Sequence, residues 1–337
     1  MTQRPDQTVQ TNTCDRVCGS EPQQQVHPPE LGLWTLGGCD LDKRLTRREA
    51  LERLSAGALL VLGLWPGALR AGDAGAGGTF RFLVVNDLHY MTPECGRWLE
   101  GVMRQMRAEE GVELCLVAGD LCEYGTAAEL GGVRDVLKTL GLPVYTVIGN
   151  HDYTAPAPAD RRRRGPRLAA PRFVLREPLG SQPMADRRYY ERFFPKQLNY
   201  WFEHRGWQFI GLDTTQGLRY QNTRIQDPTF AWVRRQLAKW DPRKPTVVFT
   251  HFPLGPSVTY RPQNADALLD LLRPLNLRAV FCGHWHGFTE RRVGNVVLTT
   301  NRCCALKRGN HDGTRQKGYF VCTARDGQIS RQFVAVN

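Results

Sequence analysis

Residues 146–152 read Thr-Val-Ile-Gly-Asn-His-Asp, an apolar, β-branched run that stops abruptly in a polar cluster. The same layout occurs twice upstream, where the runs at 80–86 and 113–118 lead into Asp-Leu-His and Gly-Asp. Short β-branched runs of this kind predict buried strands. Helical patterns at 93–110 and 127–140 separate the three runs. The resulting order, strand–helix–strand–helix–strand, predicts a parallel sheet with helices on its faces.

The alternation continues downstream. A long segment at 154–198, rich in Pro and Arg, interrupts it and is interpreted as an insertion in the domain. The third strand of the first series is predicted at 143–148, before this insertion. After the insertion, the patterns predict a hairpin at 199–203 and 207–212, helices at 230–240 and 265–272, and strands at 246–250 and 278–282. The tail is predicted to form a β meander near 296–300, 319–323 and 329–334.

Polar side chains gather just past the carboxyl ends of the predicted strands, where open α/β sheets place their ligand sites. Carboxylate, amide and imidazole groups supply the donors without any thiolate, and this mixture suits Mn, Fe, Zn or Co. Seven donors exceed the need of one ion, whereas two ions that share a bridging carboxylate would use them all. The seven candidate ligands are Asp87, His89, Asp120, Asn150, His251, His284 and His286.

One of these clusters alone could be an ordinary turn, because Asn, Asp and Gly tolerate left-handed backbone. The ordered set of Asp-x-His, Gly-Asp, Gly-Asn-His-Asp, His and Gly-His-x-His instead resembles the calcineurin-like metallophosphoesterases over about residues 79–305. The resemblance implies a four-layer α-β-β-α sandwich of the metallo-dependent phosphatase type, with a dinuclear metal centre. In that centre the first metal would be held by Asp87, His89 and His286, the second by Asn150, His251 and His284, and both would be bridged by Asp120.

The resemblance also implies roles for the two residues that follow Asn150. His151 matches the family's catalytic histidine, which is not a metal ligand, and Asp152 would orient its imidazole. Two cations would lower the pKa of a bridging water, and the resulting hydroxide would attack the phosphorus of a phosphomonoester or phosphodiester. Protonated His151 would stabilise the leaving alkoxide.

Within that superfamily, Thr-His-Phe-Pro at 250–253 and Gly-His-Trp-His at 283–286 look most like the cyclic-nucleotide-phosphodiesterase and purple-acid-phosphatase-like branch. Purple acid phosphatases carry a Tyr ligand three residues after the bridging Asp. Here that position is Glu123, and Tyr124 follows one residue later. A tyrosinate–iron centre is therefore not expected.

The N-terminal part has the layout of a targeting segment. Residues 1–45 are rich in Gln, Pro, Thr and Gly without hydrophobic periodicity, which is typical of disorder. Residues 46–76 place Arg47 and Arg48 before an apolar stretch and a run of small residues, as in a twin-arginine export signal. We expect a catalytic domain at 77–337, exported to the periplasm or the cell exterior. The alternative is an amphipathic helix in a cytoplasmic protein.

Composition excludes some classes and leaves the partner open. Hydrophobic residues make up 41% of the chain, too many for a disordered protein. No apolar run reaches the roughly 18 residues of a spanning helix, so no membrane span is expected in the mature form. The net charge is +12, from 45 Lys and Arg against 33 Asp and Glu. This charge could steer a small anionic phosphoester or nucleic acid.

Three functions are therefore compared. A nuclease or nucleic-acid-binding protein would use the basic run Arg161–Arg164 and the aromatics at 189–194 as a stacking groove. A packed hydrophobic cap made of the same aromatics would suit a hydrolase of a small phosphoester. A non-catalytic scaffold on the same fold is disfavoured, because such a protein would be expected to have lost ligands and all seven are present.

Overall fold

The computed structural model describes residues 78–155 and 186–336. The expected N-terminal segments at 1–45 and 46–76 lie outside the described residues, as does most of the insertion at 154–198. The export signal and the basic run Arg161–Arg164 are therefore expectations from sequence alone. Within the described residues, no helix combines the length and the apolar character needed to cross a membrane.

A five-stranded sheet carries the first polar clusters. Its strands are β1 (Phe80–Val85), β2 (Val112–Val117), β3 (Val144–Thr146), β10 (Gly318–Arg325) and β11 (Gln328–Ala335), in the order β11-β10-β1-β2-β3. The first three run parallel, as predicted, with Leu83 of β1 opposite Cys115 of β2. β10 pairs antiparallel with the free edge of β1, so the C-terminal hairpin completes the sheet that the first strand begins.

A six-stranded sheet carries the later clusters. Its strands are β4 (Tyr200–His204), β5 (Trp207–Leu212), β6 (Pro245–Thr250), β7 (Asn276–Cys282), β8 (Thr289–Val293) and β9 (Val296–Thr300), in the order β4-β5-β6-β7-β9-β8. The predicted tail meander is wrong, because β9 lies parallel to β7 in this sheet while β10 crosses to the other one. β8 escaped prediction because charged side chains interrupt its apolar pattern, as is common in edge strands.

Helix boundaries follow from capping residues. α2 (Pro93–Arg107) starts at the N-cap Thr92 with Pro93 in its first turn, and α3 (Ala127–Lys138) starts in a capping box of Thr126 and Glu129. The helix expected at 230–240 starts slightly earlier and finishes in a 3₁₀ turn. The other helical elements are α4 (Arg188–Phe193), α5 (Asp227–Gln236), α6 (Ala265–Leu272), η2 (Asn150–Asp152) and η3 (Leu237–Lys239).

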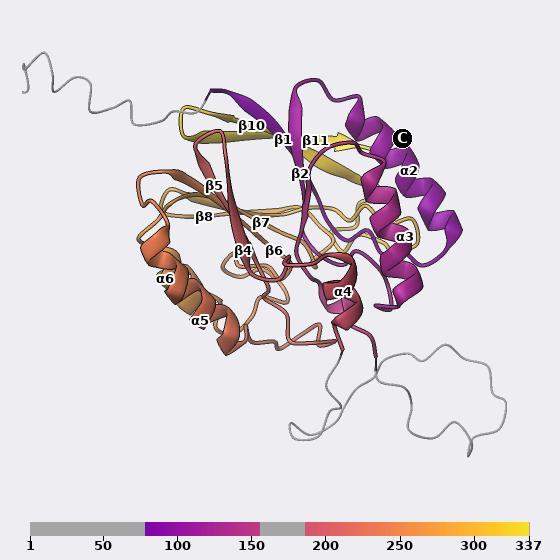
Figure 1. The fold of residues 1–337 in the computed structure, drawn as a ribbon, viewed down its shortest axis with the longest axis horizontal. Coiled ribbons are helices and arrows are strands. Elements are labelled where there is room, and N and C mark those ends of the chain that lie inside the picture. The colour runs from indigo at the N-terminus through magenta and orange to yellow at the C-terminus, as the bar shows by residue number, and fades with distance from the viewer. Residues whose placement is uncertain (1–77, 156–185, 337) are drawn as a thin grey trace, which may run out of the picture. The chain divides into compact units, whose positions relative to one another are not determined.

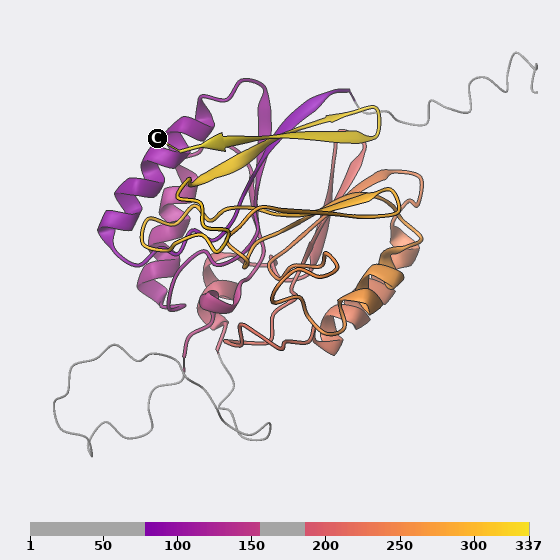
Figure 2. The same cartoon turned by 180° about the vertical axis from the view of Figure 1, so that it is seen from behind.

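Three apolar cores separate four layers. Between the sheets, the ring of Phe82 meets Phe209 and Phe281 edge to face, with centroids 5.6 and 6.1 Å apart. α2 and α3 cover the outer face of the five-stranded sheet through a core that includes Leu99, and α5 and α6 cover the other sheet through a core that includes Leu268. Figures 1 and 2 show the two helical layers on opposite sides. The expected four-layer α-β-β-α sandwich is confirmed.

The described ends of the insertion pair with each other at its base. Thr154 and Asp186 exchange backbone hydrogen bonds of 2.7 and 3.2 Å. Beyond it, Tyr190 of α4 is fully buried, with its hydroxyl 2.8 Å from Oγ1 of Thr146, and Phe194 is buried as well. These two aromatics belong to the packed core and do not present free faces for stacking, which favours the packed-cap interpretation.

Candidate metal centre

The loops that follow the strands carry an unusual backbone. Five of the seven expected ligands adopt positive φ, a region that residues other than glycine rarely occupy. Each such residue costs about 1–3 kcal/mol and persists where the surrounding structure over-determines it, typically at functional sites. Backbone hydrogen bonds tie these loops together, with the carbonyl of Asp120 accepting from the amides of Leu88 and His89. The five are Asp87 (53°), His89 (45°), Asp120 (51°), His284 (66°) and His286 (48°).

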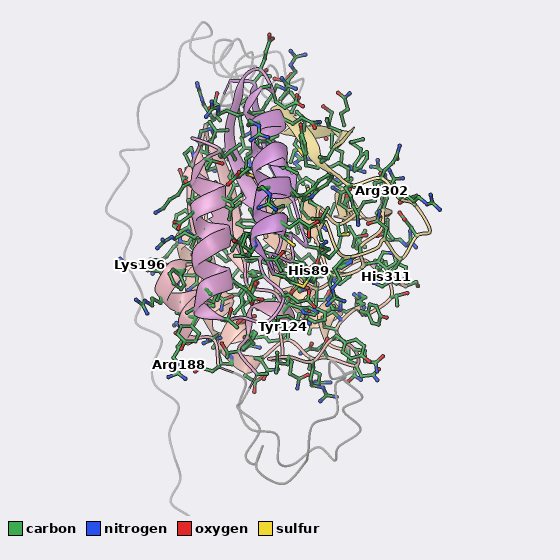
Figure 3. All side chains as sticks on the ribbon, turned by 90° about the vertical axis from the view of Figure 1, so that its right-hand side faces the viewer. His89, Tyr124, Arg188, Lys196, Arg302 and His311 are labelled. Atoms are coloured by element: carbon green, nitrogen blue, oxygen red, sulfur yellow. The ribbon has the colours of Figure 1, made fainter. Side chains whose placement is uncertain are left out.

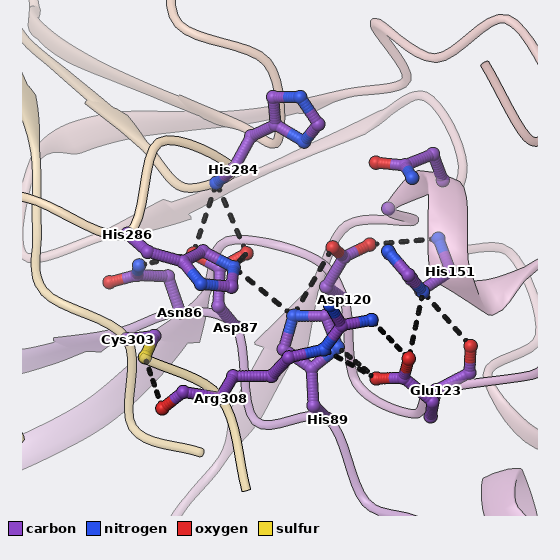
Figure 4. Close-up of polar contacts among 12 residues, drawn as sticks. Asn86, Asp87, His89, Asp120, Glu123, His151, His284, His286, Cys303 and Arg308 are labelled. Carbon is purple, nitrogen blue, oxygen red and sulfur yellow. Dashed lines mark hydrogen bonds and ion pairs between the residues drawn. The ribbon is translucent and has the colours of Figure 1, made fainter. Parts of the chain in front are cut away.

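The first group of ligand atoms combines the ends of β1, β2 and β7 (Figure 4). Asp87, His89, Asp120 and His286 each offer one atom within 4.8 Å of the others. Nε2 of His286 lies 3.2 Å from Oδ1 of Asp87 and 3.1 Å from Nε2 of His89. Nε2 of His89 in turn lies 3.5 Å from Oδ2 of Asp120. All four side chains are buried.

The second group combines the ends of β2, β3, β6 and β7. Asp120, His251 and His284 offer atoms within 4.8 Å of one another. Nε2 of His251 lies 3.3 Å from Oδ1 of Asp120, 3.1 Å from Nδ1 of His284 and 3.1 Å from Oδ1 of Asn150. Asp120 therefore presents one carboxylate oxygen to each group.

Each of the four ligand histidines is held from outside by an acceptor on its second ring nitrogen. Backbone carbonyls occupy three of these positions, and a carbonyl oxygen can only accept, so the contacted nitrogen carries the N–H. The fourth acceptor is the carboxylate of Glu123. The contacts are His251 Nδ1 to Ala118 at 3.0 Å, His284 Nε2 to Tyr220 at 2.8 Å, His286 Nδ1 to Gly309 at 3.2 Å, and His89 Nδ1 to Glu123 at 2.9 Å.

This outer shell tests whether a metal fits. With the outer nitrogens protonated, the inner nitrogens of neutral imidazoles carry lone pairs that converge on one another and on carboxylate oxygens. Nε2 of His89 and Nε2 of His286 face each other at 3.1 Å, and when both rings are neutral a cation would make this contact of two lone pairs favourable. The donor set, oxygen and imidazole nitrogen without thiolate, suits a hard or borderline ion. The residues fit a metal centre.

The charges of the metal-free site point the same way. Burial would raise the pKa of Asp87, but the charge and hydrogen bond of His286 lower it to about 2. Burial would lower the pKa of His251, but Asp120 raises it to about 9. Without a cation, the carboxylates therefore hold protons on imidazoles. Burial lowers the pKa of His89 to about 4 and that of His284 to about 3, which leaves these rings neutral and able to bind metal.

His151 lies beside both groups. Its amide donates to Oδ1 of Asp120 at 2.9 Å, and its ring Nδ1 lies 2.9 Å from the carbonyl oxygen of Glu123. Asp152 was expected to orient this ring, but in the structure it accepts from the amides of Gly149 at 2.8 Å and Cys122 at 3.0 Å. The 3₁₀ turn at 150–152 directs the carboxylate to Gly149 in its own loop and to Cys122 in the loop after β2. Asp152 fixes the loop, and the Glu123 carbonyl contacts the ring.

Sequence reasoning missed an ion pair behind the site between the buried Glu123 and the half-buried Arg308. The guanidinium of Arg308 donates hydrogen bonds to both carboxylate oxygens of Glu123, with Nε 3.0 Å from Oε2. Burial would raise the pKa of Glu123, but hydrogen bonds from His89 and Arg308 lower it to about 2. The Asp120-x-x-Glu123 spacing signalled Glu123, whereas nothing in the local pattern marked Arg308. Tyr124 next to Glu123 is 53% exposed.

The four-layer sandwich and the two donor groups that share Asp120 match the arrangement expected of the metallophosphoesterase class. A family model described as calcineurin-like phosphoesterase matches residues 80–288, more than half of the chain. The chain therefore belongs to this family.

Two relatives match this chain at low sequence identity. A probable cyclic nucleotide phosphodiesterase of Synechococcus is 26% identical over 192 residues, 54% of this chain and 60% of the relative. A glycerophosphodiester phosphodiesterase of Enterobacter lignolyticus is 25% identical over 197 residues, 57% of this chain and 62% of the relative. The matches thus span less than two thirds of either relative.

Solved structures support the fold. A dimetal phosphatase from Danio rerio superposes with a TM-score of 0.51 at 13% identity, covering 77% of this chain and 99% of the other. A purple acid phosphatase from yellow lupin seeds gives a TM-score of 0.53 at 13% identity, covering 77% and 52%. At this level of identity, the likeness concerns the arrangement of the sheets and helices.

Proposed function

We propose that the chain is a dinuclear metal-dependent phosphodiesterase, with phosphomonoesters as the alternative substrate class. One observation carries the proposal: the two carboxylate oxygens of Asp120 face separate histidine groups, 3.5 Å from His89 and 3.3 Å from His251. A carboxylate in that position suits two ions better than one. The phosphodiesterase names of both relatives favour diesters.

The side chains of this chain would divide the work. Asp87, His89 and His286 would hold one cation and Asn150, His251 and His284 the other, with Asp120 shared. When bound, Mn, Fe, Zn or Co would supply Lewis-acid charge and lower the pKa of water. The outer carbonyls and Glu123 keep the ligand nitrogens pointed inward, so the site needs little rearrangement to bind.

His151 would donate the proton to the leaving oxygen. Its Nδ1 is engaged by the Glu123 carbonyl, so protonation places a second N–H on Nε2, free to donate. Its side chain is 29% exposed, more than those of the four ligand histidines. A donor at this position can reach a substrate that the buried ligands cannot contact directly.

The test combines metal counting with catalysis. The purified chain would be stripped with a chelator, reloaded separately with Mn, Fe, Zn or Co, and assayed on methyl 4-nitrophenyl phosphate and on 4-nitrophenyl phosphate. We expect two metals per chain at full activity and faster diester turnover. Asp120→Asn should lose both activity and metal, because one shared ligand loses its charge. Full turnover with a single bound metal would refute the dinuclear proposal.

We also propose that the chain is exported by the twin-arginine route, supported by the order of Arg47, Arg48, apolar stretch and small residues. A nucleic-acid substrate is not proposed. Of the four aromatics that a stacking groove would use, Tyr190 and Phe194 are buried, and Tyr189 and Phe193 are half-buried.

A further inference from the structure

A run of aromatic rings lies beside the candidate metal centre. We call it the aromatic shelf and define it as Tyr220, Tyr260, Trp285 and His311. Ring centroids are 6.2 Å apart between Tyr220 and Tyr260, 5.9 Å between Tyr260 and Trp285, and 5.3 Å between Trp285 and His311. The rings come from three separate loops and from the ligand motif itself, so only the folded chain brings them together.

The shelf touches ligands of both metal groups. The ring of Tyr260 lies 5.2 Å from that of His284, and the ring of His311 lies 5.3 Å from that of His286. The backbone carbonyl of Tyr220 accepts the N–H of His284 at 2.8 Å. A phosphate held at the ligands would therefore place its organic substituents within reach of these rings.

Much of the shelf is open to solvent. The side chain of Tyr220 is 44% exposed and His311 is exposed, while Tyr260 and Trp285 are half-buried. Figure 3 shows His311 at the same level as His89, on the side of the molecule away from α3. Aromatic surface exposed to water beside a polar site, here most of all that of Tyr220, is unfavourable unless something covers it, and such surface marks ligand sites.

Backbone strain holds one of the rings in place. Tyr260 has φ of 66°, in the left-handed region. A bulky side chain there is a genuine outlier, and such strain concentrates at ligand clamps and active sites. A glycine would relieve the strain at this turn but would remove the ring that lies against His284.

We propose that the aromatic shelf binds a planar aromatic substituent of the substrate, such as a nucleobase, by stacking. The proposal rests on the proposed phosphoesterase function and names the substrate class for the same site. Stacking suits these rings because every planar aromatic group offers a π-face, and it needs no hydrogen-bond readout. A sugar or alkyl substituent would gain much less from the same surface.

The test uses two pairs of competitive inhibitors that differ only in the planar group: AMP against ribose 5-phosphate, and phenylphosphonate against methylphosphonate. Inhibition constants would be measured on the metal-loaded full chain from initial rates with methyl 4-nitrophenyl phosphate. Within each pair the planar member should bind about tenfold more tightly, the scale of one stacking contact. A preference in the AMP pair alone would assign a nucleobase, and one in both pairs would assign planar groups in general.

Variants separate binding from support of the metal ligands. Tyr220→Ala removes an exposed ring but keeps the carbonyl that holds His284, so it should erase most of the preference and leave ribose 5-phosphate binding unchanged. Tyr220→Phe should keep the preference. Phe288→Ala is the matched control, because Phe288 is 46% exposed near the same motif but its ring pairs with Phe320 outside the shelf.

Two outcomes would overturn the proposal. One is equal inhibition within both pairs by the unchanged chain. The other is a loss in Tyr220→Ala that is the same for all four inhibitors, which would show a merely structural role. If no metal gives turnover, the proposed function fails, and binding of the same four compounds is then read from tryptophan fluorescence. The shelf proposal is judged there by the same ratios.

Discussion

Gly149 packs so closely against Asp120 that no Cβ fits between them, and replacing it should therefore damage the metal centre for steric reasons alone. Its φ is −104°, which any residue can adopt, so the requirement is steric. A Cβ at this position would lie 2.1 Å from Oδ1 and 2.2 Å from the amide nitrogen of Asp120. Because one of these atoms belongs to the backbone, rotation of a side chain cannot relieve the overlap.

The size of the effect follows from those distances. Carbon and oxygen atoms in proteins rarely approach closer than about 3.3 Å, so Gly149→Ala must displace Asp120 or the loop by about 1 Å. A misplacement of that size lowers activity by about 10²-fold, and overpacking destabilises the fold by about 1–3 kcal/mol. Asp120 is shared between the two ligand groups, so bound metal should fall as well.

The matched control is Gly101→Ala in the interior of α2. The nearest atom to its new Cβ would be Nη2 of Arg104, at 3.7 Å. Alanine also stabilises a helix interior relative to glycine by about 0.5–1 kcal/mol. The two variants would be compared by kcat/KM on methyl 4-nitrophenyl phosphate, by metal content and by denaturant unfolding. If Gly149→Ala keeps full metal and wild-type kcat/KM, the close-packing argument is wrong.

Four further predictions concern single features. His151→Ala should keep metal but lose about 10²–10⁴-fold in rate, with a smaller loss for nitrophenolate leaving groups, which need little protonation; an equal loss across leaving groups would count against it. Glu123→Gln should weaken metal affinity about 10–100-fold in a chelator competition, because the acceptor on the ligand His89 loses its charge; unchanged affinity would contradict the role. In the metal-free chain the pKa of His251 is raised from 6.5 to about 9, so its ion pair stabilises fully below pH 6.5 and is lost as pH rises through 9. Metal binding between those values should release a proton to an indicator dye and tighten with rising pH, and no acid release would refute this. Fusion of residues 1–80 to a reporter should direct export that stops when Arg47 and Arg48 become Lys, and a reporter that stays in the cytosol would refute the targeting assignment.

The positioning contacts in the site have a shared consequence. Three ligand histidines donate their outer N–H to backbone carbonyls, whereas His89 contacts the carboxylate of Glu123 there. The ring of His286 also hydrogen-bonds the thiol side chain of Cys303. At His89, mutation of Glu123 can therefore probe the outer hydrogen-bond acceptor directly. The pairing of Glu123 with Arg308 links this ligand to the loop that also supplies Gly309 and His311. Mutations in that loop should therefore lower metal affinity at the first ligand group (Asp87, His89 and His286) more than at the second.

Much of the site was readable from the sequence because each ligand follows a predicted strand and the parallel strands of one sheet end at the same edge. The packing of the two sheets then brings their two ligand-bearing edges together. The runs at 80–86, 113–118 and 246–250 have strand periodicity, and each ends in a candidate ligand. The apolar composition of a buried strand can be recognised locally, and it places the residue after the strand at the sheet edge without knowledge of distant contacts. The structure accordingly gathers all seven expected ligands into two groups that share Asp120.

Tertiary structure alone decided the rest. Arg308 contacts Glu123, which lies 185 positions earlier in the sequence. β10, from the C-terminal part of the sequence, pairs with β1 from the start of the domain. Asp152 accepts from the amides of Gly149 and Cys122, and the Glu123 carbonyl contacts the His151 ring instead. Local periodicity reports which face of a strand or helix is buried, but it does not report which distant segment covers that face. Such contacts depend on the packing of whole layers, so the outer acceptors and the aromatic shelf became visible only in the folded chain.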